Sequence, residues 1–193
     1  MTSRHPLERL LSAYRFEMFE CLENIIRILN IRDKFFLNGD SEDERDKVAR
    51  WYELYGKDVI MKYRKTEVTD PVYSKAPTFR EFVEFIVDFP ITEYNYHWIP
   101  IYLLCMPCHF KYSIMARVDT LTRDSEQIFK AINLSDSLPR NHITQNKTTD
   151  NTVASYYSTI SRDLLDKLVE IYKFDFLLFN YTVDEFKQFA NNQ

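Results

Sequence analysis

The apolar residues at the start of the chain recur at the spacing of one helix face. They stand three and four residues apart, the period that an amphipathic α-helix needs to bury one side. Pro6 suits the first turn of such a helix, because its fixed φ is helical and its missing N–H would be unpaired there. We predict one long helix, or two in succession, from Arg4 to about Arg32. The buried face begins with Leu7, Leu10, Leu11 and Tyr14.

Helix start signals divide the rest of the chain. Thr78 and Glu81 have the spacing of a capping box before an apolar run, and Pro90 ends the helix that they predict. Ser161 can cap the last helix, which carries leucines at helical spacing as far as Ile171. Further helices are predicted at about 40–55 and 123–132.

One segment alternates as a β-strand does. From Tyr112 to Val118, every second residue belongs to one apolar face, which predicts a strand. Residues 64–77 and 133–155 are polar and turn-rich, so we predict loops there. The aromatic run from Phe174 to Tyr181 should dock the end of the chain onto the core. A single strand in a mostly helical chain suggests that the other strands of its sheet lie outside this chain.

Composition limits the possible classes of function. The 193 residues are 45% hydrophobic and 16% aromatic, which indicates one folded domain rather than a disordered chain. With only 2 glycines, the chain cannot build a Gly-rich phosphate loop. The net charge of −4 argues against a nucleic-acid partner bound through bulk charge. The local basic groups, which include Arg9, Arg64 and Arg117, are expected to be solvated.

A polar face lies beside the apolar face of the first helix. Glu8, Ser12 and Arg15 share it, at spacings that bring side chains together on a helix. Arg4 stands just before the first turn, where free N–H groups and the helix dipole favour an anion. An arginine there and a hydroxyl two turns further on can clamp a phosphate. The alternative is an ordinary amphipathic helix with a charged entry.

A second distinctive segment runs Cys105-Met-Pro-Cys108-His109. It has the spelling of a c-type haem attachment site. A thioredoxin-like dithiol is another interpretation, which requires a helix that begins at Cys105. Zinc is a third, but Cys21 is the one further cysteine, so no second pair exists to complete four ligands. A C-x-x-C redox or haem protein is therefore kept as an alternative.

The stretch from Arg4 to Arg15 resembles the 3′-phosphate-binding motif of the Golgi carbohydrate sulfotransferases of the chondroitin 4-O and HNK-1 type. The family pattern is Arg-x-Pro-Phe-x-Arg-Leu-x-Ser-Ala-Tyr-Arg, and this chain departs from it mainly by Leu7 in place of Phe. Members use 3′-phosphoadenosine 5′-phosphosulfate (PAPS) as the sulfuryl donor and no metal. The resemblance implies that Arg4 and Ser12 bind the 3′-phosphate of PAPS.

Two further blocks are similar to the family and occur in the same order. Residues 97–108 contain His-Trp-x-Pro and then Leu-Cys-Met-Pro-Cys. The predicted strand ends in Asp119-Thr-Leu, where the family has Glu-Thr-Leu. The segment from Leu168 to Tyr181 resembles the closing helix of the family and its aromatic end. The resemblance therefore extends from residue 2 to about residue 183.

Sulfuryl transfer is an in-line displacement at sulfur, and it needs a base for the proton of the acceptor hydroxyl. His97 is the candidate base, because an imidazole titrates near neutral pH. A packed, structural histidine is the equal alternative at this position. Asp119 and Asp124 are weaker candidates, and each is more expected to cap the following helix. His5 is adjacent to Arg4 in the sequence and could touch the nucleotide.

We interpret residues 1–193 as a single incomplete sulfotransferase domain, the C-terminal and mostly helical part of a P-loop-like α/β fold. The family's Lys-rich phosphosulfate loop and its membrane segment would lie upstream, so we expect this chain alone to bind PAPS poorly and to transfer little. The implied acceptor is a hydroxyl of a glycan or glycosaminoglycan of the chondroitin or dermatan kind. The implied location is the lumenal side of the Golgi membrane. A non-catalytic remnant that binds a partner is the alternative.

A lumenal location would permit disulfides and N-glycosylation. The resemblance leaves open whether Cys105 bonds Cys108 or one of them bonds Cys21, and the oligomeric state is open as well. Of the sequons, the second is the best candidate for a glycan, and the third lies in the aromatic segment, where we expect burial. The sequons begin at Asn133, Asn146 and Asn180.

Overall fold

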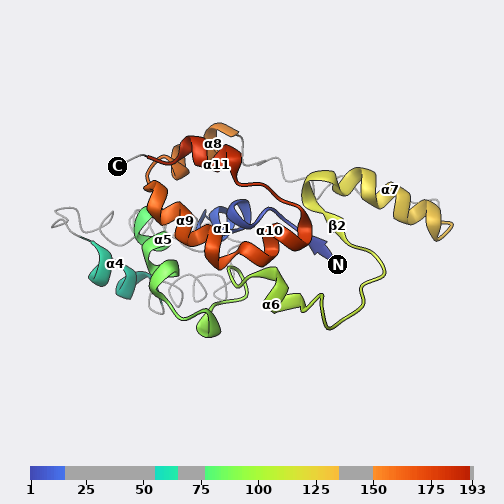
Figure 1. The fold of residues 1–193 in the computed structure, drawn as a ribbon, viewed down its shortest axis with the longest axis horizontal. Coiled ribbons are helices and arrows are strands. Elements are labelled where there is room, and N and C mark those ends of the chain that lie inside the picture. The colour runs from blue at the N-terminus through green and yellow to red at the C-terminus, as the bar shows by residue number, and fades with distance from the viewer. Residues whose placement is uncertain (16–54, 65–76, 135–149, 192–193) are drawn as a thin grey trace, which may run out of the picture.

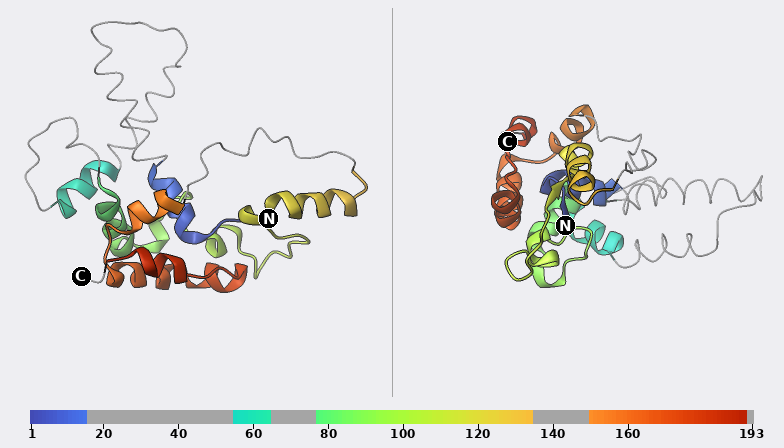
Figure 2. Two further views of the ribbon diagram at one scale, coloured as in Figure 1. Left: turned by 90° about the horizontal axis from the view of Figure 1, so that it is seen from above. Right: turned by 90° about the vertical axis from the view of Figure 1, so that its right-hand side faces the viewer.

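The structure is a computed structural model, mostly helical, with one small parallel sheet among the residues that it describes. Helix α1 (Pro6–Tyr14) lies near the centre, with α5 (Phe79–Asp88) beside it (Figure 1). The helices of the C-terminal quarter run along one side of the molecule (Figure 2). The described residues are 1–15, 55–64, 77–134 and 150–191.

The leucine face of α1 is the centre of the core. All of the predicted apolar positions of this helix are buried, with exposed fractions of 5% or less, and Pro6 occupies the first turn. The hydroxyl of Tyr14 donates to the carbonyl of Pro77 at 3.0 Å, which ties α1 to the start of α5. The start of the predicted helix is therefore confirmed, and its extension from residue 16 lies outside the described residues. The buried apolar positions are Leu7, Leu10, Leu11 and Tyr14.

The sheet joins the start of the chain to its middle. Strand β1 (Thr2–Ser3) pairs in parallel with β2 (Ala116–Arg117), with Ser3 opposite Arg117. The predicted strand was too long, because residues 112–115 lie outside the sheet. Pairing extends only where β1 provides a partner, and the apolar side chain of Met115 is 58% exposed.

The predicted capping box is present at the start of α5. The Thr78 hydroxyl accepts the Glu81 N–H at 3.2 Å, and the Glu81 carboxylate accepts the Thr78 N–H at 2.7 Å. Helix α4 (Lys57–Tyr63) packs against α5 and ends at Arg64, whose guanidinium donates twice to Glu81 at 2.8 Å. Arg64 was expected to be solvated, but its side chain is only 10% exposed because this carboxylate holds it inside.

A turn-rich segment follows α5 and carries the second sequence block. The 3₁₀ helix η4 (Ile91–Glu93) leads to a turn that contains the fully buried Trp98. Helix α6 (Ile101–Cys105) comes next and lies beside α10 (Lys173–Phe179). The chain then runs through exposed residues to β2 (Figure 1).

Beyond β2, the 3₁₀ helix η5 (Val118–Thr120) opens helix α7 (Leu121–Ala131), which confirms the helix predicted near 123–132. Helix α7 projects away from the rest of the molecule (Figures 1 and 2). Among its residues, Ser125 is the one that is buried.

Four helices complete the described chain. Ser161 caps α9 by accepting the Leu164 N–H at 3.2 Å, as predicted. The loop predicted for residues 133–155 was wrong in its last part, because α8 begins at Asp150 and buries Val153 and Tyr157 against the core. None of the described helices combines the length and the apolar character that crossing a bilayer requires. The helices are α8 (Asp150–Tyr157), α9 (Arg162–Ile171), α10 (Lys173–Phe179) and α11 (Asp184–Phe189).

Candidate functional site

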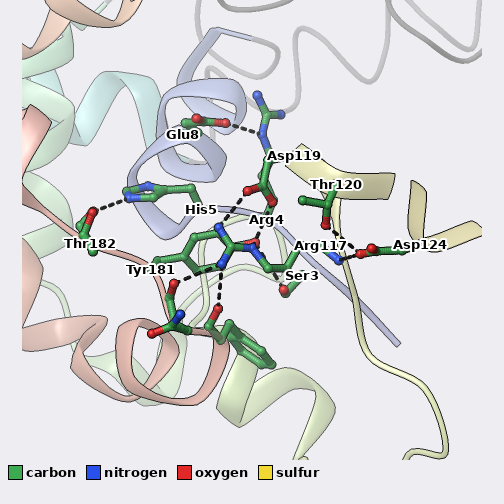
Figure 3. A network of polar contacts seen from close by, with 12 residues as sticks. Ser3, Arg4, His5, Glu8, Arg117, Asp119, Thr120, Asp124, Tyr181 and Thr182 are labelled. Carbon is green, nitrogen blue, oxygen red and sulfur yellow. Dashed lines mark hydrogen bonds and ion pairs between the residues drawn. The ribbon is translucent and has the colours of Figure 1, made fainter. Parts of the chain in front are cut away.

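The first candidate contact for a ligand lies where β1 leads into α1. The Nε atom of Arg4 donates to Oε2 of Glu8 at 3.3 Å, which directs the guanidinium along the helix (Figure 3). Glu8 and Ser12 are four residues apart, so they are neighbours on the same helix face. The structure thus brings Arg4, Glu8 and Ser12 onto one side of α1, and all three are partly exposed.

Arg4 precedes the helix, which begins at Pro6, and its ion pair with Glu8 holds the guanidinium against the first turn. In addition, no side chain caps the N-terminus of α1. Its first-turn N–H groups and positive dipole end therefore favour an anion at this junction.

His5 does not share this face, contrary to the suggestion that it could touch the nucleotide. Its Nε2–H donates to the Thr182 carbonyl at 2.9 Å (Figure 3). The ring stacks on Phe186 at 4.6 Å and meets the edges of Phe176 and Tyr181. Burial lowers the pKa of His5 despite the opposing effect of the Thr182 bond. His5 is therefore a packed neutral histidine that fixes the entry of α1.

Arg117 forms a second polar cluster beside the start of α1 (Figure 3). Its guanidinium donates to both oxygens of Asp119, at 3.0 and 2.7 Å, and to the Asn180 carbonyl at 3.0 Å. It lies over the ring of Tyr181 at 4.3 Å, and the Tyr181 hydroxyl shares a hydrogen bond of 3.2 Å with Ser3. Arg117 was expected to be solvated, and its side chain is 34% exposed. Its contacts also join β2 to the C-terminal segment, which was not expected.

The contacts of Asp119 and Asp124 are structural. Asp119 pairs with Arg117 and does not cap α7. The Oδ2 atom of Asp124 accepts the Thr120 hydroxyl at 2.6 Å and the Arg117 N–H at 3.3 Å. The hydroxyl bond is the largest cause of a lowered pKa for Asp124, so this carboxyl is a weak proton acceptor. A hollow of about 480 Å³ lies between β2 and α7, with Arg117, Arg123 and Asp124 on its polar wall.

His97 lies in the turn that precedes α6. Its backbone N–H donates to Oδ1 of Asn95 at 3.0 Å, and its ring lies 4.1 Å from the ring of Tyr96. The side chain is half-buried. Burial, and then the positive charge of Arg9, lower the pKa of His97 below its ordinary value. The imidazole is therefore neutral at neutral pH, which is the state that a proton acceptor requires.

Arg9 is the residue of this site that the sequence analysis missed. Its guanidinium donates to the Ile99 carbonyl, with a longer contact of 3.5 Å to the Tyr96 carbonyl. On the helix Arg9 lies opposite the leucine face, so the apolar pattern predicts exposure. It is instead covered by the turn at 95–99. The sequence alone gives no signal for this contact, because the two segments are about 90 residues apart.

The C-x-x-C segment does not have the geometry of a thioredoxin-like dithiol or of a zinc site. Helix α6 ends at Cys105, whereas a thioredoxin-like dithiol needs a helix that begins there. The thiols of Cys105 and Cys108 are both free, so the structure has no bond between them, and Cys21 lies outside the described residues. Within the described ranges, no three His, Cys, Asp or Glu side chains come together as a metal site would require.

The sequons differ from expectation at one position. Asn180 is exposed, although burial was expected, and its left-handed backbone (φ 53°) forms the C-cap of α10. Asn133 is exposed as well, and Asn146 lies outside the described residues.

Comparison with known proteins assigns the chain to a family. The profile of the sulfotransferase family matches residues 1–182. Carbohydrate sulfotransferase 11 of Rattus norvegicus is 29% identical over 189 residues, and that of Danio rerio is 31% identical. In both cases the match covers 95% of this chain and 46% of the relative.

Carbohydrate sulfotransferase 14 of Danio rerio is 30% identical over 184 residues, which is 94% of this chain and 43% of the relative. The chain thus spans less than half the length of these relatives. No solved structure matches it. With the family profile covering nearly the whole of its length, the chain belongs to the sulfotransferase family.

Proposed function

We propose that this chain carries the part of a PAPS-dependent carbohydrate sulfotransferase that binds the 3′-phosphate of the donor and activates the acceptor hydroxyl. The observation that supports this most directly is the arrangement of Arg4, Glu8 and Ser12 along one face of α1. The matching relatives are named carbohydrate sulfotransferases, which supports a sugar as the acceptor.

In this proposal the terminal nitrogens of Arg4 and the hydroxyl of Ser12 bind the 3′-phosphate. Glu8 orients the guanidinium through its Nε atom, and the terminal nitrogens are the atoms proposed to donate to the ligand. The first-turn N–H groups of α1 add neutral donors close to Arg4. The three groups suit a dianionic phosphate, because two of them are donors without charge and one carries the compensating charge.

His97 is proposed as the general base. PAPS supplies the sulfuryl group, which passes to the hydroxyl oxygen of the acceptor as adenosine 3′,5′-bisphosphate leaves. An unprotonated ring nitrogen of His97 takes the hydroxyl proton as the new S–O bond forms. The contacts of Arg9 with the turn at 95–99 support this assignment, because they attach His97 to the same helix that carries Ser12. Arg9 and Ser12 are three residues apart and therefore adjacent on α1.

The family also suggests the setting in which the chain acts. We propose a glycosaminoglycan acceptor of the chondroitin or dermatan kind and a location on the lumenal side of the Golgi membrane. The exposed sequons at Asn133 and Asn180 are compatible with a lumenal compartment. We further propose one sulfotransferase domain over residues 1–193, in which few strands are present.

The chain on its own should bind the donor weakly. It contains only 2 glycines, so it holds no glycine-rich loop for the 5′-phosphosulfate, and the contacts named above reach only the 3′-phosphate. Titration calorimetry with adenosine 3′,5′-bisphosphate should therefore give a dissociation constant of about 1 mM or weaker, a binding free energy no more favourable than about −4 kcal/mol. Micromolar binding would overturn the expectation of weak affinity.

The position of the 3′-phosphate is tested by a pair of ligands and a pair of variants. The wild-type chain should prefer adenosine 3′,5′-bisphosphate to adenosine 5′-monophosphate, and Arg4→Ala should abolish the preference. A charge-assisted hydrogen bond contributes about 1.5–3 kcal/mol, which corresponds to a loss of about tenfold or more in affinity. Ser12→Ala should lower the affinity for adenosine 3′,5′-bisphosphate less than Arg4→Ala does, because the Ser12 hydroxyl is an uncharged hydrogen-bond donor.

Arg80→Ala is the matched control. Arg80 and Glu84 form the same kind of pair on α5, four residues apart, with Nε and Oε1 at 3.1 Å. Its removal should leave the ligand preference intact. Equal effects of the two arginine substitutions, or no preference in the wild-type chain, would contradict the proposed phosphate site.

A second candidate is a partner-binding role without catalysis, which the exposed apolar side chains of α6 and α10 favour. The same titration separates the two functions, because a partner-binding chain has no reason to prefer a 3′-phosphorylated nucleotide. The exposed side chains are Leu103, Leu104, Phe174, Leu177 and Leu178.

A further inference from the structure

We propose that Arg9 is a positioning residue that holds the turn of His97 on α1 and, balanced by Asp175, sets the charge that the imidazole experiences. The inference rests on the proposed role of His97 as the base, and it adds to that role the residues that prepare it. In this proposal the segment around His97 and the first helix act together to position the imidazole.

The first step of the argument is the contact of Arg9 with the turn. One terminal nitrogen of Arg9 donates to the Ile99 carbonyl, and the other lies 3.5 Å from the Tyr96 carbonyl. These two carbonyls flank His97 on either side. Because a guanidinium is planar and holds its donors in a fixed fork, contact with both carbonyls fixes the orientation of the turn relative to α1.

The second step is that the rest of the turn is held from the C-terminal helices. The Tyr172 hydroxyl donates to the Trp98 carbonyl at 2.6 Å. The carboxylate of Asp175, fully buried in α10, accepts the N–H groups of Ile101 and Tyr102 at 2.7 and 2.8 Å. Three side chains, one from α1 and two from the start of α10, therefore hold backbone groups of the segment that carries His97.

The third step concerns charge. Burial lowers the pKa of the Arg9 guanidinium, while Tyr172, Asp175 and Cys105 oppose that change. Burial also raises the pKa of Asp175, and its two N–H donors and Arg9 oppose that change. A cation and a carboxylate that interact electrostatically each favour the charged form of the other. Arg9 is thus a cation whose charge is partly compensated.

His97 responds to this charge. Arg9 is the charged group from α1 that acts on it, and its neighbours within the turn, Asn95 and Tyr96, are neutral. Asp175 interacts electrostatically with Arg9, and in this proposal it offsets part of the charge that His97 experiences. Removing the cation and removing the anion must therefore change His97 in opposite directions, whereas loosening of the turn would change it in one direction only.

The test is a titration of the His97 imidazole by NMR in the full chain, with Arg9→Met, Arg9→Lys and Asp175→Asn compared with the wild type. We expect the pKa of His97 to rise in Arg9→Met, to fall in Asp175→Asn and to stay near the wild-type value in Arg9→Lys. Shifts of the same sign in Arg9→Met and Asp175→Asn, or no shift in either, would overturn the proposal.

Two further measurements cover a failure of Arg9→Met to fold and separate the role of Arg9 from that of His97. If Arg9→Met does not fold, Asp175→Asn must still lower the pKa of His97 relative to Arg9→Lys, and a failure to do so overturns the proposal. The proposed base is tested separately by His97→Gln in a sulfuryl-transfer assay that is sensitive enough to detect the low transfer expected of the wild-type chain. Retained transfer in His97→Gln together with the expected NMR shifts would reject the base and leave the positioning role of Arg9 intact.

Discussion

At the scale of single residues, the two histidines near α1 differ in what surrounds them. His5 is enclosed by aromatic rings and bonded to the Thr182 carbonyl, whereas His97 is half-buried in a turn beside Arg9. Both have a lowered pKa, and burial is the largest cause in each case. The surroundings differ, because aromatic rings pack around the ring of His5, whereas His97 lies in a turn beside a cation.

Burial of His5 predicts a dependence of stability on pH. Its folded-state pKa lies below the ordinary value of 6.5, so its contribution to stability is complete above about pH 6.5 and is lost as the pH falls through the lower folded value. Each unit of lowering is equivalent to about 1.4 kcal/mol. We expect the free energy of unfolding, measured by denaturant titration, to decrease from about pH 7.5 to about pH 5.5.

His5→Phe keeps the ring stack and removes the titrating group. The free energy of unfolding should therefore decrease less between about pH 7.5 and about pH 5.5. His97→Gln should reduce the loss of stability at low pH further, because the pKa of His97 is lowered in the folded state as well. An unchanged slope in His5→Phe would show that protonation of His5 does not oppose folding.

The same residues show how far sequence reasoning reaches. Glu8 and Ser12 could be placed on one face in advance, because helical spacing alone decides their relation. The burial of Arg9 could not, since the turn that covers it lies far along the chain. Likewise, nothing local predicts that Asp175, in an aromatic run, caps α6 from a separate helix.

At the scale of elements, the pair between Arg64 and Glu81 joins the end of α4 to the capping box of α5. Burial raises the pKa of Glu81, but the hydrogen bonds from Arg64 and the Thr78 N–H outweigh it, and the net pKa is lowered. Both side chains are about one-tenth exposed, at 10% and 11%. A carboxylate in that position depends on its cation to remain charged.

Arg64→Ala should therefore destabilise the fold by about 3 kcal/mol or more, because it leaves Glu81 buried without its main partner. The control is Lys62→Ala. The pair of Lys62 with Asp88 joins the same two helices at 3.5 Å but is 62% and 53% exposed. An exposed pair contributes about 0–1 kcal/mol, so thermal or chemical denaturation should separate the two variants clearly. Similar losses in both would contradict the account of this junction.

Elements with a strong local signal were predicted correctly, and those that depend on distant partners were not. The capping box at Thr78 and the cap at Ser161 are local, and both are present. The strand predicted to begin at Tyr112 has only two residues in the structure, because its partner β1 is equally short. Helix α8 was not predicted, because the sequence around its two buried apolar residues, Val153 and Tyr157, is mostly polar and shows no clear apolar period.

At the scale of the whole molecule, the first residues lie between segments from the middle and the end of the chain. Strand β1 pairs with β2, the Tyr181 hydroxyl bonds Ser3, and the Tyr157 hydroxyl bonds the Leu7 carbonyl at 2.8 Å. The described residues therefore support the entry of α1 from several sides. This is the property that a phosphate site requires, because preorganised donors need no rearrangement when the ligand arrives.

The most direct test of the account is to locate the nucleotide by NMR, with ¹⁵N spectra of the full chain recorded during titration with adenosine 3′,5′-bisphosphate and with adenosine 5′-monophosphate. The account predicts that only the 3′-phosphorylated ligand shifts the Nε signal of Arg4 and the amide signals of the first turn of α1 and of Ser12. Equal shifts with both ligands, or shifts confined to the hollow between β2 and α7 beside Arg117 and Arg123, would contradict it.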